Sequence, residues 1–217
     1  MHKQVRLFLG IAFIEGASVM AVELSGAKLV APFFGDSLAV WASVLGVTMM
    51  GLALGYFLGG RMSEKMKGPE KLFLVLAGAA FFTALMPLDS RWVMQATQSM
   101  DVRWGSLLSA MVFLMPPMLL FGMVSPLLIR LGSTEPEKAG KVSGMVFGLS
   151  TIGGIFATFL MGFYLIPNWG LTRPLWLFAG LLFMLPILFW GKQKKWKNTI
   201  AVIFLSLLGP GLELIFA

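Results

Sequence analysis

The chain has 217 residues, of which 58% are hydrophobic and 12% are charged. An ordinary soluble domain carries about 25% charged residues, so this composition excludes a water-soluble surface over most of the chain. The formal net charge is +7, and the absence of cysteine excludes disulfides, iron–sulfur clusters, zinc–thiolate sites and cysteine nucleophiles.

Long apolar runs recur along the sequence and predict transmembrane helices. A helix needs roughly 20 apolar residues to cross a ~30 Å hydrocarbon core, where its backbone groups must be bonded within the segment. We therefore expect an all-α membrane protein, a single polytopic domain over residues 1–217 with about seven helices and no soluble domain. In chain order, the predicted segments are residues 5–31, 38–60, 72–88, 106–131, 142–167, 174–191 and 199–217.

The basic residues alternate between the two sets of loops. Because Lys and Arg collect on the cytoplasmic side of a membrane, this bias predicts an orientation with the N-terminus inside and the C-terminus outside, N-in and C-out. It also accounts for the positive net charge without nucleic acid. One side carries Lys3, Arg6, Arg61, Lys65, Lys67, Lys71, Arg130, Lys138, Lys141, Lys192, Lys194, Lys195 and Lys197, whereas the other carries Arg91, Arg103 and Arg173.

The first segment contains an acidic residue, Glu15, about 15 Å along the helix from Val5 and hence near mid-membrane. An ionisable group at that depth costs several kcal/mol, so it usually faces a cavity or a partner. We interpret Glu15 as a cation-binding or proton-coupling carboxylate; the alternative is a structural acid, protonated or hydrogen-bonded between helices. Glu15 also interrupts the apolar region that a cleaved signal peptide requires, so we expect the segment to be retained.

Three further polar residues of the first segment are candidates for substrate or ion binding. Glu23 and Lys28 lie about 140° apart on an unbroken helix, so a direct ion pair requires a break between them. Without a break, we expect Lys28 to extend outward and Glu23 to find a partner elsewhere. Glu15 and Glu23 are about 80° apart and can line one cavity together with Ser18.

Glycines repeat at every fourth position in the second segment and again in the fifth. In lipid, such a repeat makes a smooth groove that permits the close approach of another helix. Helix packing is the expected role, and the alternative is a sliding surface for a conformational change. The residues are Gly51, Gly55 and Gly59, then Gly144 and Gly148 with Gly153 and Gly154 beyond them.

The fourth segment contains Pro116, Pro117 and Pro126, which we expect to break or kink the helix because each removes a backbone hydrogen bond. Segments one and two share a weak pattern with segments four and five: a charged or proline-containing helix leads into a glycine-rich helix. Since the two triplets run in opposite directions, the pattern favours a 3+3 inverted repeat plus one helix, as in many secondary transporters.

The sequence lacks the motifs of common enzymes. No P-loop, GxSxG, HExxH or strand-associated GxGxxG pattern occurs, so we expect no enzymatic activity. The alternative, an intramembrane enzyme, would have two carboxylates as its candidate catalytic groups. The single histidine is His2 and the 16 methionines have no Cys or His partners, so we expect no metal and no cofactor.

Four stretches resemble the membrane part of the fused major facilitator superfamily (MFS) transporter/spermidine synthase family. They are ELSGAKLVAPFFG at 23–35, its continuation DSLAVWASVLGVTMMGLALGYFLGGRM, PPMLLFGMVSPLLIRL, and AGKVSGMVFGLSTIGGIFATFLMGFYLIPNWG. The resemblance covers about residues 16–170. The chain departs from the family in lacking the aminopropyltransferase domain, and the usual Asp of the loop after helix two is not evident, although Glu64 can stand in.

This resemblance implies a half-MFS-like bundle in the lipid bilayer, as a multi-pass protein of the bacterial inner membrane. It implies transport of a small solute, for example a cationic polyamine. Half of the usual helix number implies a homodimer or another partner. The alternative is a non-transporting membrane subunit that anchors or feeds a separately encoded spermidine-synthase-like protein.

Overall fold

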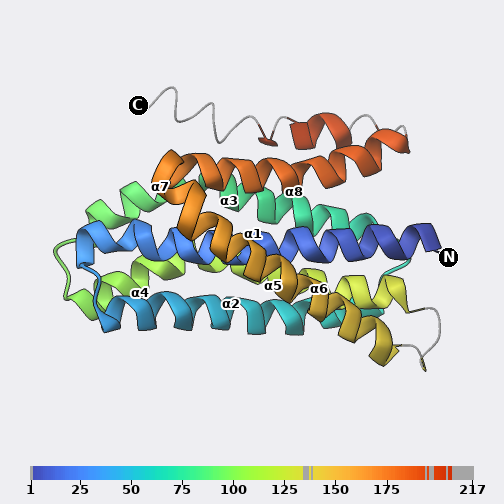
Figure 1. The fold of residues 1–217 in the computed structure, drawn as a ribbon, viewed down its shortest axis with the longest axis horizontal. Helices are drawn as coiled ribbons and strands as arrows, with labels where there is room; N and C mark the ends of the chain where they lie inside the picture. Colours follow the sequence, from blue (N-terminus) through green and yellow to red (C-terminus); the bar gives the residue numbers. More distant parts are fainter. Residues whose placement is uncertain are drawn as a thin grey trace.

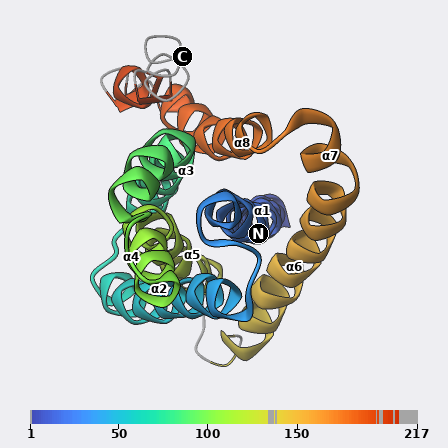
Figure 2. The same cartoon turned by 90° about the vertical axis from the view of Figure 1, so that its left-hand side faces the viewer.

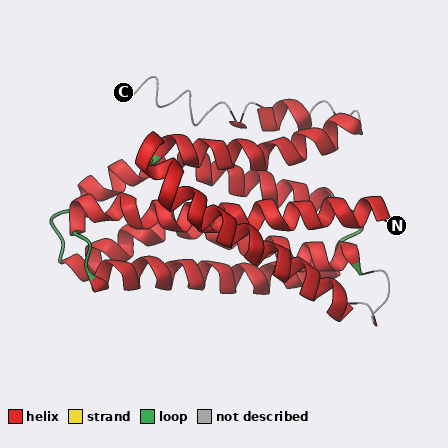
Figure 3. Cartoon of the chain, viewed as in Figure 1, coloured by secondary structure: helices red, strands yellow, loops and turns green. Residues whose placement is uncertain are grey.

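The computed structural model describes residues 2–133, 137, 139–193, 195, 198–203 and 205–206, with the side chains of 2–5 left out. Within these ranges every regular element is a helix and none is a strand, as Figure 3 shows. The all-helical fold expected from the apolar runs is thereby confirmed for the described part of the chain.

Six helices or helical runs are long and apolar enough to cross a membrane. They are α1 (His2–Phe34), α2 (Leu38–Glu64), α3 (Glu70–Thr97), α5 (Met115–Gly132), the run Ala139–Trp169, and α8 (Thr172–Lys192). The run Ala139–Trp169 comprises α6 (Ala139–Leu160), a π-helical turn η2 (Met161–Leu165) and α7 (Ile166–Trp169). These six correspond to the first six predicted segments and support a multi-pass membrane protein. Of the seventh, residues 199–203 and 205–206 are helical, and the rest lies outside the described residues.

The predicted fourth segment is divided into two helices. The 12-residue α4 (Val102–Phe113) and α5 meet at Leu114, and Pro116 and Pro117 occupy the first turn of α5. Proline suits this position because the first N–H groups of a helix have no partner within it. By contrast, α5 continues through Pro126, so the predicted helix break at that residue is wrong.

Hydroxyl pairs join the short helix α4 to its two neighbours. Ser106 Oγ lies 3.0 Å from Ser43 Oγ of α2, and Ser109 Oγ lies 2.7 Å from Thr97 Oγ1 of α3. The hydroxyls of Ser43, Ser106 and Thr97 also lie within hydrogen-bond distance of a carbonyl oxygen one turn earlier in the same helix, so the contacts between helices add to bonds within them. They tie α4 into the bundle, so that α4 and α5 together occupy the place of one crossing.

The helices form a bundle with α1 at its centre. Figure 2 shows α1 surrounded by the other helices, with α2 to α5 on one side, α6 on the other and α8 above. The most extensive contacts are those of α2 with α5, α1 with α6, and α3 with α8. Successive crossings run in opposite directions, so alternate loops lie at opposite ends of the bundle (Figure 1). We call the end that carries the α2–α3 connection and the end of α8 the basic end.

Glycine determines how closely the two best-packed helix pairs approach. A Cβ atom on Gly55 of α2 would lie 2.2 Å from the Leu119 carbonyl oxygen of α5, and one on Gly153 of α6 would lie 2.2 Å from the Phe13 carbonyl oxygen of α1. Gly51 and Gly59 likewise pack against α5. Because these neighbours are backbone atoms or lie close to the backbone, a larger residue would force the helices apart.

The packing face predicted at Gly144 and Gly148 is wrong for contacts within the described chain. Both glycines are exposed, and a Cβ atom on either would meet nothing within 4 Å. Instead, Gly153 and Gly154, one to two turns further along α6, lie against α1. Gly144 and Gly148 therefore lie on a face of α6 that no other helix covers within the described residues.

Candidate functional site

The carboxyl group of Glu15 lies inside the bundle, near the middle of α1. Glu15 is 3% exposed, and its Oε2 atom accepts a hydrogen bond of 3.0 Å from Ser150 Oγ of α6. The neighbouring Gly16 makes this contact possible, because a Cβ atom at Gly16 would lie 2.0 Å from the Ser150 carbonyl oxygen. The close approach of α1 and α6 thus delivers one hydroxyl donor to one oxygen of the buried acid.

Glu15 lies in the wall of a cavity of about 270 Å³ between α1, α2 and α6. Its buried floor is formed by Glu15, Gly16 and Val19 of α1, whereas Tyr56 of α2 and Thr151 of α6 are exposed at its rim. The cavity therefore opens on the face between α2 and α6. The remaining lining residues are Met20, Leu52, Ser150, Gly154, Ile155 and Thr158.

An aromatic contact spans α2 and α6 beside this opening. The rings of Tyr56 and Phe147 meet edge to face, with their centroids 6.4 Å apart. Tyr56 also lines the cavity, and Phe147 lies one helical turn from Thr151. Edge-to-face pairs of this kind contribute about 0.5–1.5 kcal/mol. The pair therefore joins α2 to α6 beside the cavity.

The other acid of the first segment, Glu23, lies outside this cavity. Glu23 lies seven residues, or two helical turns, after Gly16, which lines the cavity. Glu23 is therefore on the same side of α1 as Gly16 but nearer the end opposite the basic end. It is half-buried and does not line the cavity. Glu15 and Glu23 therefore share one side of α1 without sharing one cavity, contrary to the sequence-based prediction.

Ser18 does not line the cavity either. Its hydroxyl donates a hydrogen bond of 2.7 Å to the Ile14 carbonyl oxygen one turn earlier on α1. Serine commonly makes this bond within a helix, where it satisfies the hydroxyl without an external partner. The predicted role of Ser18 at the site is thus wrong, and the hydroxyl beside Glu15 comes from α6.

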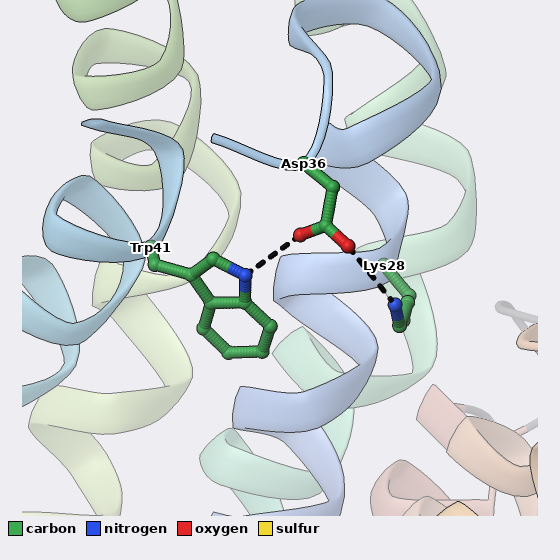
Figure 4. A network of polar contacts seen from close by, with 3 residues as sticks. All are labelled: Lys28, Asp36 and Trp41. Atoms are coloured by element: carbon green, nitrogen blue, oxygen red, sulfur yellow. Dashed lines mark hydrogen bonds and ion pairs between the residues drawn. The ribbon is translucent and has the colours of Figure 1, made fainter. Parts of the chain in front are cut away.

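Lys28 is paired with Asp36 and not with Glu23. Lys28 Nζ lies 3.7 Å from Asp36 Oδ2, and Trp41 Nε1 donates a hydrogen bond of 2.7 Å to Asp36 Oδ1. Figure 4 shows both side chains pointing toward the Asp36 carboxylate. Because α1 runs unbroken from His2 to Phe34, the break that a Glu23–Lys28 pair would require is absent. Lys28 extends outward, as expected for an unbroken helix, and its network joins α1 to the start of α2 across the turn at Gly35.

Sequence reasoning identified Glu15 but missed the residues that surround it. Ser150, Thr151 and Thr158 are polar residues of an otherwise apolar segment, and Tyr56 is one of two tyrosines in the chain. Their spacing on α6 follows helical turns, which could have marked a polar side of that helix. Assigning them to Glu15, however, requires knowing that α6 packs against α1.

No family model, no curated protein and no solved structure matches the chain.

Proposed function

We propose that the chain is a membrane transporter, resembling half of an MFS protein, that moves a small cationic solute such as a polyamine. The observation that carries the proposal is the carboxyl group of Glu15 at the floor of a cavity in the middle of the bundle. A carboxylate buried without a positive partner is costly, so a cation in the cavity would offset that cost.

The cavity has the chemistry to bind an ammonium group. A carboxylate has about four acceptor positions, and a single donor, Ser150, contacts Glu15 among the described residues. The hydroxyl oxygens of Thr151 and Thr158 lie in the same lining and can accept further N–H bonds. At about 270 Å³, the cavity falls just below the usual range of about 300–1,000 Å³ for ligand pockets. It suits one ammonium-bearing portion of an elongated solute.

The pairing of the helices supports an inverted repeat. Counting α4 with α5, and α6 with α7, as single crossings, three of the four most extensive contacts join one with five, two with four, and three with six. Exchanging the first three crossings for the last three leaves this set of three pairs unchanged. The remaining extensive contact, three with four, has a much smaller counterpart in one with six. Both related pairs also cross at glycine: Gly55 lies against Gly122, and Gly16 against Ser150. Repeats of this kind place solute sites at their interface near mid-membrane.

The positions of the basic side chains support an orientation with the basic end in the cytoplasm. Lys65, Lys67 and Lys71 lie at the α2–α3 connection, whereas Gln98 follows α3 at the other end. We expect Lys67→Cys and Gln98→Cys to react with an impermeant thiol reagent from opposite sides of the membrane. The absence of native cysteines leaves no background labelling. Labelling of both from the same side would exclude the proposed orientation.

We further propose that a second copy covers the face between α2 and α6. The cavity opens there, α6 is the least buried of the six long runs, and its exposed glycines permit close approach. Gly148→Cys should therefore form dimers in membranes treated with a short bifunctional thiol reagent. Leu181→Cys, exposed on α8, is the control and should remain monomeric. Equal dimer yields from the two variants would contradict this interface.

The test of transport is uptake of radiolabelled spermidine into proteoliposomes that contain the purified chain. We expect uptake that saturates with solute concentration, depends on an imposed ion gradient or membrane potential, and is absent from protein-free liposomes. Unlabelled spermidine should compete, whereas a neutral solute of similar length should not. Accumulation equal to that of protein-free liposomes would exclude transport of this solute.

A further inference from the structure

A cavity lined by lysines lies at the basic end, away from Glu15. It has a volume of about 390 Å³ and is formed by the α2–α3 connection, the start of α3 and Gln193 after α8. Lys65, Lys67 and Lys71 contribute its positive charges. Lys71 Nζ donates a hydrogen bond of 3.2 Å to the Lys65 carbonyl oxygen, which fixes that ammonium group beside the cavity.

The N-terminus of α3 forms part of the same cavity and adds positive potential. The helix begins at Glu70 after Pro69, and no side chain caps it. The first N–H groups of a helix have no partner within the helix, and the helix dipole favours an anion beside them. The carboxylate of Glu70 is the one acid in the lining, and it is paired with Lys195. The cavity therefore combines three lysines with an uncapped helix N-terminus and a neutralised acid.

Two apolar cavities adjoin the basic cavity on either side of the contact between α3 and α8. One, of about 640 Å³, also includes Glu70 and Lys71 in its lining and extends past Leu74 and Phe81 of α3 to Asn198, Ala201, Val202 and Leu205. The other, of about 310 Å³, shares Gln193 and is lined by Leu7, Leu185 and Leu188. The rings of Phe73 and Phe189, which also line the smaller cavity, stack with their centroids 4.0 Å apart.

A buried donor without an acceptor lies in the wall of the larger apolar cavity. Trp190 is 4% exposed, and its indole Nε1–H has no hydrogen-bond acceptor among the residues that the structure describes. Trp190 belongs to the last turn of α8, close to the lysines. Tryptophan is enriched at the level of lipid headgroups, so its place beside the basic cavity agrees with a lipid headgroup there.

We propose that these three cavities form a binding site for one anionic phospholipid. The phosphate and headgroup occupy the basic cavity against Lys65, Lys67 and the start of α3, and the two acyl chains lie in the two apolar cavities. The combination of one basic and two apolar cavities matches a two-chain lipid better than free phosphate, which has no use for the apolar surface. The site is independent of the Glu15 cavity and of the transport proposal.

The test is direct lipid binding to the purified full-length chain in detergent. The probes are fluorescent phosphatidylglycerol and phosphatidylcholine with identical acyl chains. We expect phosphatidylglycerol to bind at least about tenfold more tightly. Lys65→Gln/Lys67→Gln should weaken the binding of phosphatidylglycerol roughly 10- to 30-fold, since each basic residue contributes about 1 kcal/mol. The affinity for phosphatidylcholine should stay unchanged. The control of equal charge, Arg130→Gln/Lys141→Gln, changes basic residues outside the cavity and should bind as the unaltered chain does.

A second variant tests the apolar part of the site. Ala201→Trp, which places a large side chain in the wall of the larger cavity, should weaken the binding of both lipids and keep the preference between them. Equal affinity for the two lipids, or equal losses in the two double variants, would overturn the proposal. Displacement of the lipid by millimolar inorganic phosphate would assign the site to a free anion. Displacement by a soluble acidic protein would assign it to a protein partner.

Discussion

Glu15→Gln is expected to reduce gradient-driven spermidine uptake about 100-fold or more. Removing one member of a buried charge pair costs about 3–5 kcal/mol, which corresponds to a loss of roughly two to three and a half orders of magnitude. Glutamine has nearly the same shape and can still accept the hydrogen bond from Ser150, so the change removes the negative charge and little else. Initial uptake rates in proteoliposomes at low solute concentration measure the effect.

The same substitution should leave the fold at least as stable as before. A carboxylate that is 3% exposed and contacts one hydroxyl among the described residues is costly to bury, whereas a neutral amide is less so. Thermal unfolding in detergent should therefore give a Tm equal to or above that of the unaltered chain. A structural acid would behave differently: its loss would lower the Tm and reduce uptake through unfolding.

Glu137→Gln is the matched control for this experiment. Glu137 carries the same group but is exposed in the connection between α5 and α6 and does not line the cavity. Its uptake should equal that of the unaltered chain. Equal uptake by Glu15→Gln and Glu137→Gln would show that the buried charge has no role in transport, and the proposed function would then lose its main support.

The features that could be predicted from the sequence are those that a single helix determines. An apolar run of sufficient length must be helical in lipid, so the first six segments were located from composition. Glu15 was identified because a charge inside such a run is costly wherever the helix lies. The repeat at Gly51, Gly55 and Gly59 predicted close packing, because small residues on one face serve no other common purpose in lipid.

The features that were missed depend on the relation between helices. Ser150 meets Glu15 because α6 crosses α1 at Gly16, and nothing in either segment alone specifies that crossing. Lys28 has two acids at comparable separations along the chain, and the turn at Gly35 decides in favour of Asp36. The division of the fourth segment at Leu114, by contrast, agrees with the helix break predicted from Pro116 and Pro117, because a proline acts on the backbone of its own helix.

The second large effect is expected at Gly55. In Gly55→Ala, the added methyl group would lie 2.2 Å from the Leu119 carbonyl oxygen and 2.8 Å from Gly122 Cα, both backbone atoms of α5. A backbone cannot yield as a flexible side chain can, so α2 and α5 must separate, which costs about 3 kcal/mol at the upper end of the usual range for overpacking. Thermal or denaturant unfolding of the purified chain should show the loss.

The control lies on the same helix. Gly46 is exposed in α2, and a Cβ atom there would meet nothing within 4 Å, so Gly46→Ala should leave stability unchanged or raise it slightly through the better helix propensity of alanine. Gly153→Ala should behave like Gly55→Ala, because its methyl group would lie 2.2 Å from the Phe13 carbonyl oxygen of α1. Equal stability of all three variants would mean that neither crossing is as close as the fold requires. In that case Ser150 would not reach Glu15, and the cavity between α1, α2 and α6 would have a different lining.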